Sequence, residues 1–156
     1  MIRLNKLTDY AVVVLAQMAN DTDAVITAPK LARDTGVPAP TVAKLLKALV
    51  RAEILTSQRG AGGGYVLGQA ATDITVADII SALEGPISLT ACVDGNDLTC
   101  EVETLCPMRG NWDKVNRAIR DALESVTLAE MADMQLPFAP PPASSASPAI
   151  GAASGR

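Results

Sequence analysis

The chain has 156 residues, of which 49% are hydrophobic and 19% are charged, and this composition suits one compact domain with a modest extension. It contains no histidine, which excludes the catalytic triads, zinc hydrolase sites and proton shuttles that depend on imidazole. The formal net charge of −4 combines unlike halves, because residues 1–60 carry eight Lys and Arg against five Asp and Glu, and the remainder carries five against twelve. A basic half joined to an acidic half is compatible with a nucleic-acid binder that senses a signal with its other half.

Two helices are predicted near the start of the chain. Residues 8–20 carry apolar side chains at helical spacing, with Thr8 as a possible N-cap and Asp9 in the first turn. A shorter helix is predicted over residues 28–35, and Gly36 suits its C-cap.

A third predicted helix, residues 40–51, follows the short link Gly-Val-Pro and combines an apolar stripe with a basic face. Two helices joined by a short turn that contains glycine, with cations on the exposed face of the second, are typical of a helix-turn-helix. A plain helical bundle with solvated lysines is the alternative. The stripe consists of Val42, Leu45, Leu46 and Leu49, and the basic face consists of Lys44, Lys47 and Arg51.

A hairpin is predicted over residues 54–67, with strands on either side of a glycine loop at residues 60–64. A hairpin directly after the third helix is the wing of a winged helix. The glycines do not form a nucleotide-binding loop, because Tyr65 takes the last glycine position of GxGxxG and Gln69 takes the place of a Walker lysine. Arg59, at the mouth of the loop, is suited to entering a minor groove or gripping phosphates.

The acidic half contains two further predicted helical regions. Residues 75–84 form a helix that a Gly-Pro pair ends. Another helix begins at residue 111 or 112 and either continues or restarts after Thr127, through Met134. Its apolar face is wide enough that we expect a second copy of the chain to cover it as a two-fold dimer, although it could instead pack back on its own domain. This face comprises Trp112, Val115, Ala118, Ile119, Ala122, Leu123 and Val126.

The N-terminal residues do not resemble a secretory signal, because polar residues interrupt the apolar stretch that follows Arg3 and Lys6. No segment approaches the roughly 18 consecutive apolar residues of a membrane span. We therefore expect a cytoplasmic protein with no membrane partner. In that compartment three clustered cysteines are metal or redox ligands rather than a disulfide framework.

The cysteines Cys92, Cys100 and Cys106 are spaced C-x7-C-x5-C in a stretch rich in Gly, Asn and Asp. Buried structural cysteines usually lie in apolar, regular elements, so three inert thiols are the less favoured interpretation. Three thiolates suit an iron-sulfur cluster, zinc or copper(I), and the spacing does not select among them. It does not match the paired C-x-x-C knuckles of structural zinc.

These segments resemble the IscR/NsrR-type winged-helix regulators, a family that uses iron-sulfur clusters to sense cluster supply, iron, nitric oxide or redox state. The resemblance extends from about residue 2 to residue 134 and rests on RLNKLTDYAVVVL, RGAGGGYVLG, ITVADIISALEG and the three-cysteine loop before a long helix. CPMRGNW and VTLAEM are most similar to the subgroup that regulates SUF-type cluster-assembly operons. The resemblance implies a homodimeric transcription regulator that binds double-stranded promoter DNA and an iron-sulfur cluster, with 2Fe-2S ahead of 4Fe-4S.

The resemblance also implies a ligand set. Cys92, Cys100 and Cys106 match the three cluster ligands. Some members carry a histidine three residues after the last cysteine, where this chain has Arg109. Others take a carboxylate from the first helix of the partner subunit, and Asp9 occupies that place, although it also suits a first turn stabilised by the helix dipole. Alternatives for the fourth ligand are Glu101, Glu103 and a small molecule.

For DNA, the third helix matches the recognition helix of the family and Arg59 matches its wing arginine. Position 43 is acidic in some members, where it takes part in choosing between DNA sites, and here it is Ala43. Thr41, Lys44 and Lys47 are the predicted contacts to bases or phosphates on this helix.

The sequence thus predicts a mainly α fold with a small β-hairpin wing. Residues 1–70 form a winged helix-turn-helix DNA-binding region, residues 71–135 hold the cluster-binding loop and the dimerisation helices, and residues 136–156 are a disordered tail rich in Pro, Ala and Ser. Two alternatives remain for the function: a regulator that uses zinc or direct thiol oxidation, and an iron-sulfur carrier or assembly scaffold. An enzyme is not predicted, because the chain offers no catalytic constellation.

Overall fold

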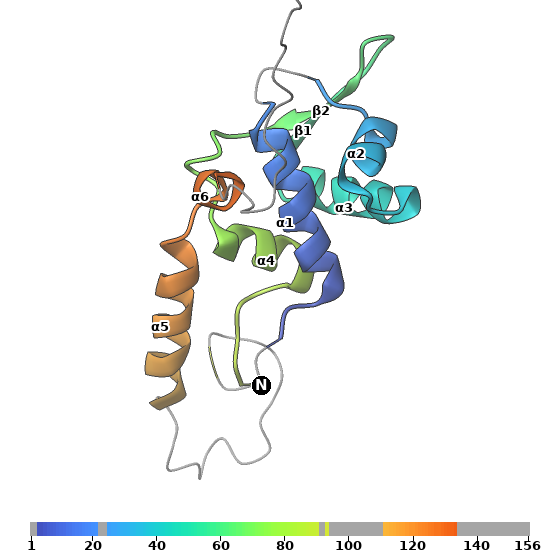
Figure 1. Ribbon diagram of the computed structural model, residues 1–156. Helices are drawn as coiled ribbons and strands as arrows, with labels where there is room; N and C mark the ends of the chain where they lie inside the picture. Colours follow the sequence, from blue (N-terminus) through green and yellow to red (C-terminus); the bar gives the residue numbers. More distant parts are fainter. Residues whose placement is uncertain (1–2, 22–24, 91–92, 94–110, 134–156) are drawn as a thin grey trace, which may run out of the picture.

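The computed structural model describes residues 3–21, 25–90, 93 and 111–133 (Figure 1). The three cysteines and the predicted tail lie outside these residues. Within the described ranges the chain forms six helices and one two-stranded sheet. In chain order these are α1 (Lys6–Ala19), α2 (Ala28–Thr35), α3 (Ala39–Arg51), β1 (Leu55–Gln58), β2 (Gly64–Leu67), α4 (Val76–Glu84), α5 (Asn111–Glu124) and α6 (Leu128–Ala132).

The first helix begins before the position that the sequence predicts. Asn5 is the N-cap of α1, and its side-chain Oδ1 accepts a hydrogen bond from the Leu7 N–H at 2.7 Å. The prediction of Thr8 as the N-cap is wrong, because Thr8 lies inside the helix, fully buried, and donates its hydroxyl to the carboxylate of Glu84. A residue whose partner lies on a distant helix gives no local signal of that role.

The helix-turn-helix that the sequence predicts is confirmed in α2 and α3. The Thr27 side chain caps α2, and Gly36 ends it in the left-handed conformation at φ 71°, which glycine adopts without steric cost. After a short link α3 begins at Ala39 and packs against α2. Its buried side chains are those of the predicted stripe, namely Val42, Leu45, Leu46 and Leu49.

One core joins the winged head to the C-terminal half of the described chain. Five helices each contribute a fully buried aliphatic side chain to it: Leu15, Leu31, Leu46, Ile79 and Leu128. The short helix α6 therefore packs back against α1, although more than a hundred residues separate them in sequence. Burial of these side chains gives the head its stability, since each contributes about 1.5–3 kcal/mol of transfer free energy.

The hairpin is the predicted wing. β1 and β2 pair antiparallel, with Leu55 opposite Leu67 and Gln58 opposite Gly64. The strand β2 is also joined to the chain before α2, because Ile26 and Tyr65 exchange backbone hydrogen bonds of 3.0 and 2.8 Å. This bridge fixes the base of the hairpin to the head and leaves its loop projecting beyond α2 (Figure 1).

Of the remaining helices, α4 and α6 pack against α1, and α5 extends away from the head. A capping box between Thr75 and Asp78 begins α4. The helical region after residue 111 restarts at Thr127 rather than continuing, because Thr127 and Glu130 form a second capping box at the start of α6. The helix α5 lies beside α4 and projects below the head (Figure 1). None of the described helices is both long enough and apolar enough to cross a membrane.

Candidate nucleic-acid interface and sensor region

The exposed face of α3 carries the predicted contacts. Lys44 and Lys47 are exposed on the side of the helix opposite the buried stripe, and Thr41 is half-buried at the edge of the stripe. Neither lysine forms a salt bridge with a carboxylate of the described residues. Both ammonium groups can therefore meet the phosphates or base edges of a nucleic acid without first losing an internal partner.

Arg59 lies at the end of β1, at the mouth of the wing loop, and is exposed. The next residue, Gly60, has φ 116°, a backbone conformation that L side chains rarely adopt, so the turn after Arg59 requires glycine. In Figure 1 the wing loop and α3 project on the same side of the head. This is the arrangement in which a helix occupies one groove of a duplex while a wing reaches the backbone or a neighbouring groove.

The cations of α2 differ from those of α3, because carboxylates already balance them. The Lys30 ammonium lies 3.0 Å from Asp34 and 3.6 Å from Asp21, and the Arg33 guanidinium lies 3.6 Å from Asp34. The hydrogen bond to Asp34, assisted by the charges of Asp34 and Asp21, raises the pKa of Lys30 above its usual value. Within the helix-turn-helix and the wing, the uncompensated positive charge therefore lies on α3 and the wing rather than on α2.

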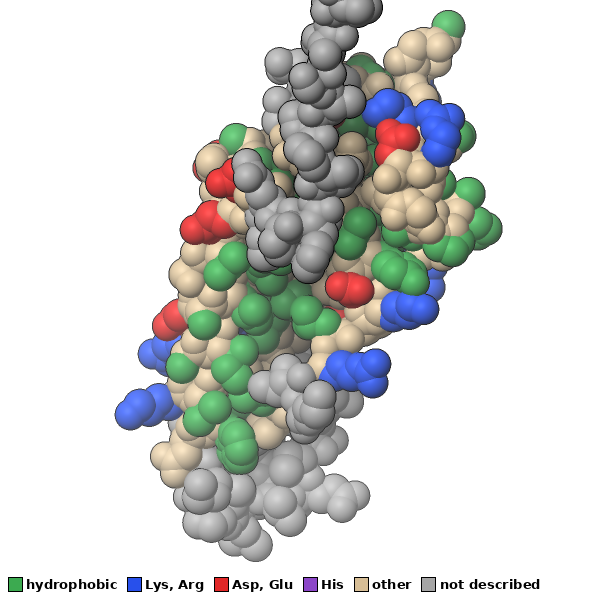
Figure 2. Space-filling view, viewed as in Figure 1, with side chains coloured by type: hydrophobic (Ala, Val, Ile, Leu, Met, Phe, Trp, Pro, Cys, Tyr) green, Lys and Arg blue, Asp and Glu red, His purple; other side chains and the backbone are tan. Residues whose placement is uncertain are grey.

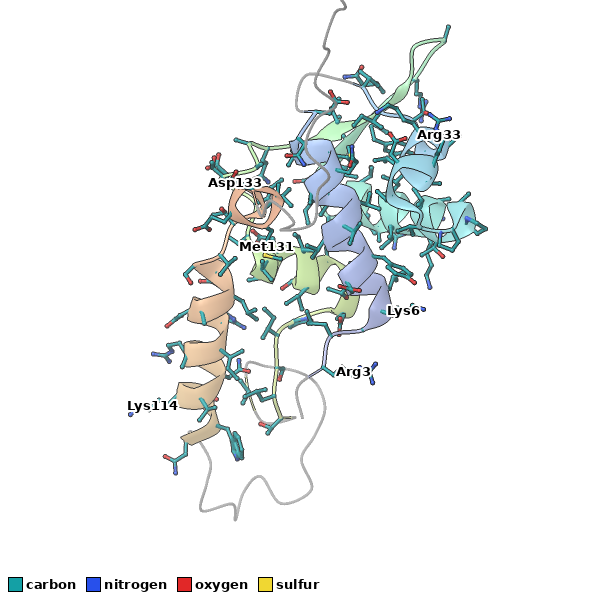
Figure 3. The ribbon with its side chains drawn as sticks, viewed as in Figure 1. Arg3, Lys6, Arg33, Lys114, Met131 and Asp133 are labelled. Atoms are coloured by element: carbon teal, nitrogen blue, oxygen red, sulfur yellow. The ribbon has the colours of Figure 1, made fainter. Side chains whose placement is uncertain are left out.

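Asp9, the predicted fourth cluster ligand, is exposed in an open cleft of about 770 Å³ beside the first turn of α1. Arg3 and Lys6 line the same cleft, and Lys6 holds its ammonium 5.3 Å from the centre of the Tyr10 ring. These two cations point outward from the edge of the molecule below α3 (Figures 2 and 3). The Asp9 carboxylate has no salt bridge within the described ranges, so it is available to a ligand that approaches from outside the chain.

Glu84 fixes the turn that carries Asp9, a role that the sequence did not reveal. Its Oε1 accepts hydrogen bonds from the Asn5 N–H at 3.1 Å and from the Thr8 hydroxyl at 2.5 Å. Glu84 is the last residue of α4, so one carboxylate oxygen ties the start of α1 to the end of α4. In the sequence, the polar Thr8 beside an apolar stretch suggested only a helix N-cap.

Asn116 is a second functional candidate that the sequence did not reveal. It is 1% exposed and is the one fully buried residue of α5. Its Oδ1 accepts a hydrogen bond from the Leu89 N–H and its Nδ2 donates one to the Ile87 carbonyl, both at 3.0 Å. The carboxamide therefore holds the chain that leads from α4 toward the cysteine segment.

The predicted apolar face of α5 is largely uncovered by the described residues. Trp112 is 40% exposed and Val115 is 44% exposed. Ala118 and Ala122 are also exposed, and the other members of the face are half-buried. An exposed tryptophan and valine on one helix are unusual for a surface that meets only water, so this face is available to a partner.

The three predicted cysteine ligands, Cys92, Cys100 and Cys106, lie outside the described residues. Among residues 3–21, 25–90, 93 and 111–133, no group of three His, Cys, Asp or Glu side chains is arranged to hold a metal ion. Of the four predicted ligands, the structure describes only Asp9, and a carboxylate oxygen is a chemically reasonable donor to an iron site.

Comparison with known proteins places this geometry among transcription regulators. The model of the Rrf2 family, described as iron-dependent transcriptional regulators, matches residues 4–134. A protein of Mycobacterium tuberculosis named as an HTH-type transcriptional regulator is 29% identical over 136 residues, which cover 86% of this chain and 84% of that protein.

Two solved structures share the fold. CymR, described as the global cysteine regulator of B. subtilis, matches with a TM-score of 0.67 and 28% identity, over 85% of this chain and 97% of CymR. IscR of T. potens matches with a TM-score of 0.62 and 27% identity, over 83% of this chain and 85% of that chain. The mainly α winged fold that the sequence predicts is confirmed, and these relatives are regulators rather than enzymes.

Proposed function

The chain belongs to the Rrf2 family of transcriptional regulators, and from this premise we propose that it is a homodimeric iron-sulfur sensor that controls SUF-type cluster-assembly genes. As a helix-turn-helix regulator it acts on DNA and is not an enzyme. In the proposal, residues 1–70 bind double-stranded promoter DNA, and residues 71–135 hold the cluster and form the dimer. The observation that carries the proposal is the combination of a winged head with three clustered cysteines that follow it in the same chain.

The proposed DNA contacts are Thr41, Lys44 and Lys47 of α3 and Arg59 of the wing. The exposure of Lys44, Lys47 and Arg59 supports this assignment, as does the lack of a salt bridge to any of these three cations from the described carboxylates. In a dimer the two recognition helices would enter major grooves about one helical turn apart, which requires a palindromic or pseudo-palindromic operator.

The proposed cluster ligands are Cys92, Cys100 and Cys106 of one subunit with Asp9 of the other, and 2Fe-2S is favoured over 4Fe-4S. Three thiolates and one carboxylate are a donor set that suits ferric and ferrous iron. The exposed Asp9, facing an open cleft, can reach a site on a second copy of the chain. When bound, the cluster would supply a centre whose presence and oxidation state depend on iron, sulfide and oxidants.

The proposed dimer interface is the apolar face of α5, where Trp112 and Val115 are exposed large apolar side chains. A second copy of the same face would cover these side chains in a two-fold arrangement. With Asp9 on the head of one subunit and the cysteines on the other, each site would span the dimer.

In the proposal, a change at the cluster site alters the affinity for DNA by moving helices. Glu84 and Thr8 hold the first turn of α1, so a force on Asp9 moves α1 together with the end of α4. Because α1 packs against α2 and α3, that movement reaches the recognition helix. A difference of about 1.4 kcal/mol between the two states is enough for a tenfold change in operator affinity.

A second candidate is a regulator in which zinc or direct thiol oxidation replaces the cluster, and the similarity to CymR, which is described as a cysteine regulator and not as a cluster protein, favours a sensor other than a cluster. Anaerobic purification separates the two candidates, since an iron-sulfur protein is coloured and contains iron and acid-labile sulfide, whereas a zinc or free-thiol protein has neither. A third candidate, an iron-sulfur carrier or scaffold, would load a cluster without salt-dependent binding to a promoter.

The experiment that tests the proposal compares wild-type protein with Cys100→Ala after anaerobic purification. We expect iron, sulfide and visible absorption in the wild type and a promoter affinity that differs between cluster-loaded and cluster-free forms. We expect Cys100→Ala to lose both properties. A Cys100→Ala protein that retains the absorption and the cluster-dependent affinity would contradict the proposal.

A further inference from the structure

The chain between α4 and the cysteine segment is attached to two other parts of the molecule. This stretch, residues 85–90, forms a strap. It leaves α4 at Gly85, which has φ 89°, and ends at Thr90, two positions before Cys92 in the sequence. The residue before the strap, Glu84, binds the start of α1 through Asn5 and Thr8. The strap therefore directly follows a residue that also holds the head.

The middle of the strap is attached to α5 through Asn116. The carboxamide satisfies one donor and one acceptor of the strap, the Leu89 N–H and the Ile87 carbonyl, at 3.0 Å each. This is the pattern with which a neighbouring strand would pair, so a shift of the strap by one residue would break both bonds. Because Asn116 is 1% exposed, water cannot replace them freely.

The strap also has internal order. The Ser88 hydroxyl donates to the Thr90 carbonyl at 2.8 Å, and a longer contact of 3.4 Å joins it to the carbonyl of Val93, which is fully buried. Hydrogen bonds within the strap thus restrain its conformation. A displacement of its end at Thr90 therefore also displaces Ile87 and Leu89.

The presence of an asparagine at position 116 indicates the role of this residue. A helix that needs only adhesion usually buries aliphatic side chains, yet the one fully buried residue of α5 is an amide. A buried amide whose oxygen and NH2 group are both hydrogen-bonded stabilises the packing of two segments less than an apolar side chain would. It does, however, fix a unique alignment of α5 and the strap. Asn116 therefore specifies where α5 sits relative to the strap.

We infer that Asn116 is the positioning residue through which the strap sets the placement of α5, and hence of the proposed dimer face beside it. Val115 precedes Asn116, and Trp112 lies one turn earlier on the same helix, so rotation or translation of α5 at Asn116 moves both exposed apolar side chains. The inference rests on the proposed function, in which that face forms the dimer and the segment after the strap responds to the signal.

The test uses full-length protein with Asn116→Ala, with Asn116→Leu and with the control Lys114→Ala. Leucine has the same number and branching of side-chain heavy atoms as asparagine but cannot form these hydrogen bonds, so it removes them without opening a cavity and remains informative if the alanine variant does not fold. Lys114 is exposed on the same helix and points away from the body of the molecule (Figure 3). Each protein is measured for its dimer dissociation constant in the cluster-free form and for its promoter affinity in cluster-free and cluster-loaded forms.

We expect both Asn116 variants to raise the dimer dissociation constant at least about fivefold, with Lys114→Ala within about twofold of wild type. We also expect the ratio of promoter affinities between the two forms to fall at least about fivefold at unchanged iron content. A merely structural loss would weaken both forms alike and leave that ratio intact. Either an unchanged ratio or an unchanged dimer constant overturns the inference.

Failure of the proposed function has a different signature. A wild-type protein that contains no iron and sulfide, or that has equal promoter affinity in both forms, refutes cluster sensing. In that case the dimer constant of the cluster-free variants alone decides the inference. A value within twofold of wild type overturns it, and a fivefold increase supports it.

Discussion

The hydroxyl of Thr8 donates a hydrogen bond to the carboxylate of Glu84 at 2.5 Å, across 76 positions of sequence. Thr8 is fully buried, and the same Oε1 atom also accepts the Asn5 N–H at 3.1 Å. A single carboxylate oxygen therefore satisfies one donor from the N-cap residue and one from the first turn of α1. This turn also carries Asp9, so the contact joins the proposed sensor residue to the helix from which the strap leaves.

Replacement of Glu84 by alanine should destabilise the protein, because it leaves the buried Thr8 hydroxyl without an acceptor. We expect Glu84→Ala to lower the free energy of unfolding by about 1–2 kcal/mol in urea denaturation. Glu84→Gln, which keeps a side-chain acceptor oxygen, should lose less. The control Glu124→Ala, at an exposed site on α5, should stay within about 0.5 kcal/mol of wild type. Equal stability of the Glu84→Ala and Glu124→Ala proteins would refute the structural role of this contact.

Acid sensitivity should arise in part from Glu130. Hydrogen bonds from the Thr127 backbone and hydroxyl lower the pKa of Glu130 below its ordinary value of 4.5. A carboxyl with a lowered pKa in the folded state stabilises the protein above its unfolded pKa, and this contribution is lost as pH falls from about 4.5 through the folded pKa. Glu130→Gln should therefore flatten the dependence of stability on pH below about 4.5 while reducing stability at neutral pH. Thermal unfolding between pH 3 and 7 measures this, and identical pH profiles for the two proteins would contradict it.

Local rules predicted those parts of the fold whose causes are local. Gly36 ended α2, as its cap preference predicts, and the stripe of α3 was buried as its spacing predicts. Thr8 and Asn116 escaped prediction because their hydrogen bonds reach residues 76 and 27 positions away. Hydrophobic periodicity carries no information on such pairs, since a buried polar residue within a helix looks like a defect until its partner is known. The candidate site was therefore predictable in its residue types but not in the contacts that position them.

The salt dependence of DNA binding should identify the contact residues. A phosphate contact that is lost reduces the slope of log affinity against log salt by about 0.9. We expect this reduction for each of Lys44→Ala, Lys47→Ala and Arg59→Ala, whose cations are not engaged in salt bridges with described carboxylates. Lys114→Ala, on α5 away from the head, is the control and should leave the slope unchanged. Titrations of a promoter fragment at several salt concentrations measure it, and variant slopes equal to that of the control would exclude these residues from the interface.

The exposed apolar face of α5 should tolerate no charge at its centre if a second copy covers it. Val115→Glu would place a carboxylate from each subunit in an apolar two-fold interface, where like charges meet. We expect the dimer dissociation constant to rise at least about 30-fold, which corresponds to ~2 kcal/mol. Sedimentation velocity over a concentration series measures this change. The control Lys114→Glu reverses a charge on the neighbouring exposed residue and should leave the dimer intact. If Val115→Glu is as dimeric as this control, the dimer interface lies elsewhere.

Asp9 can be tested against a matched exposed aspartate on the same chain. Asp9→Asn removes the carboxylate charge but keeps the size of the side chain. The folded head should be unaffected, because Asp9 is exposed and no described cation lies within salt-bridge distance of it. If Asp9 is the fourth ligand, the anaerobically purified variant should lose its visible absorption to a chelator about tenfold faster than wild type or more. Asp73→Asn, at an aspartate after the wing that is also exposed, should lose its visible absorption at the wild-type rate. Equal rates for all three proteins, at equal iron and sulfide content, would exclude Asp9 and leave Glu101, Glu103 or a small molecule as the fourth ligand.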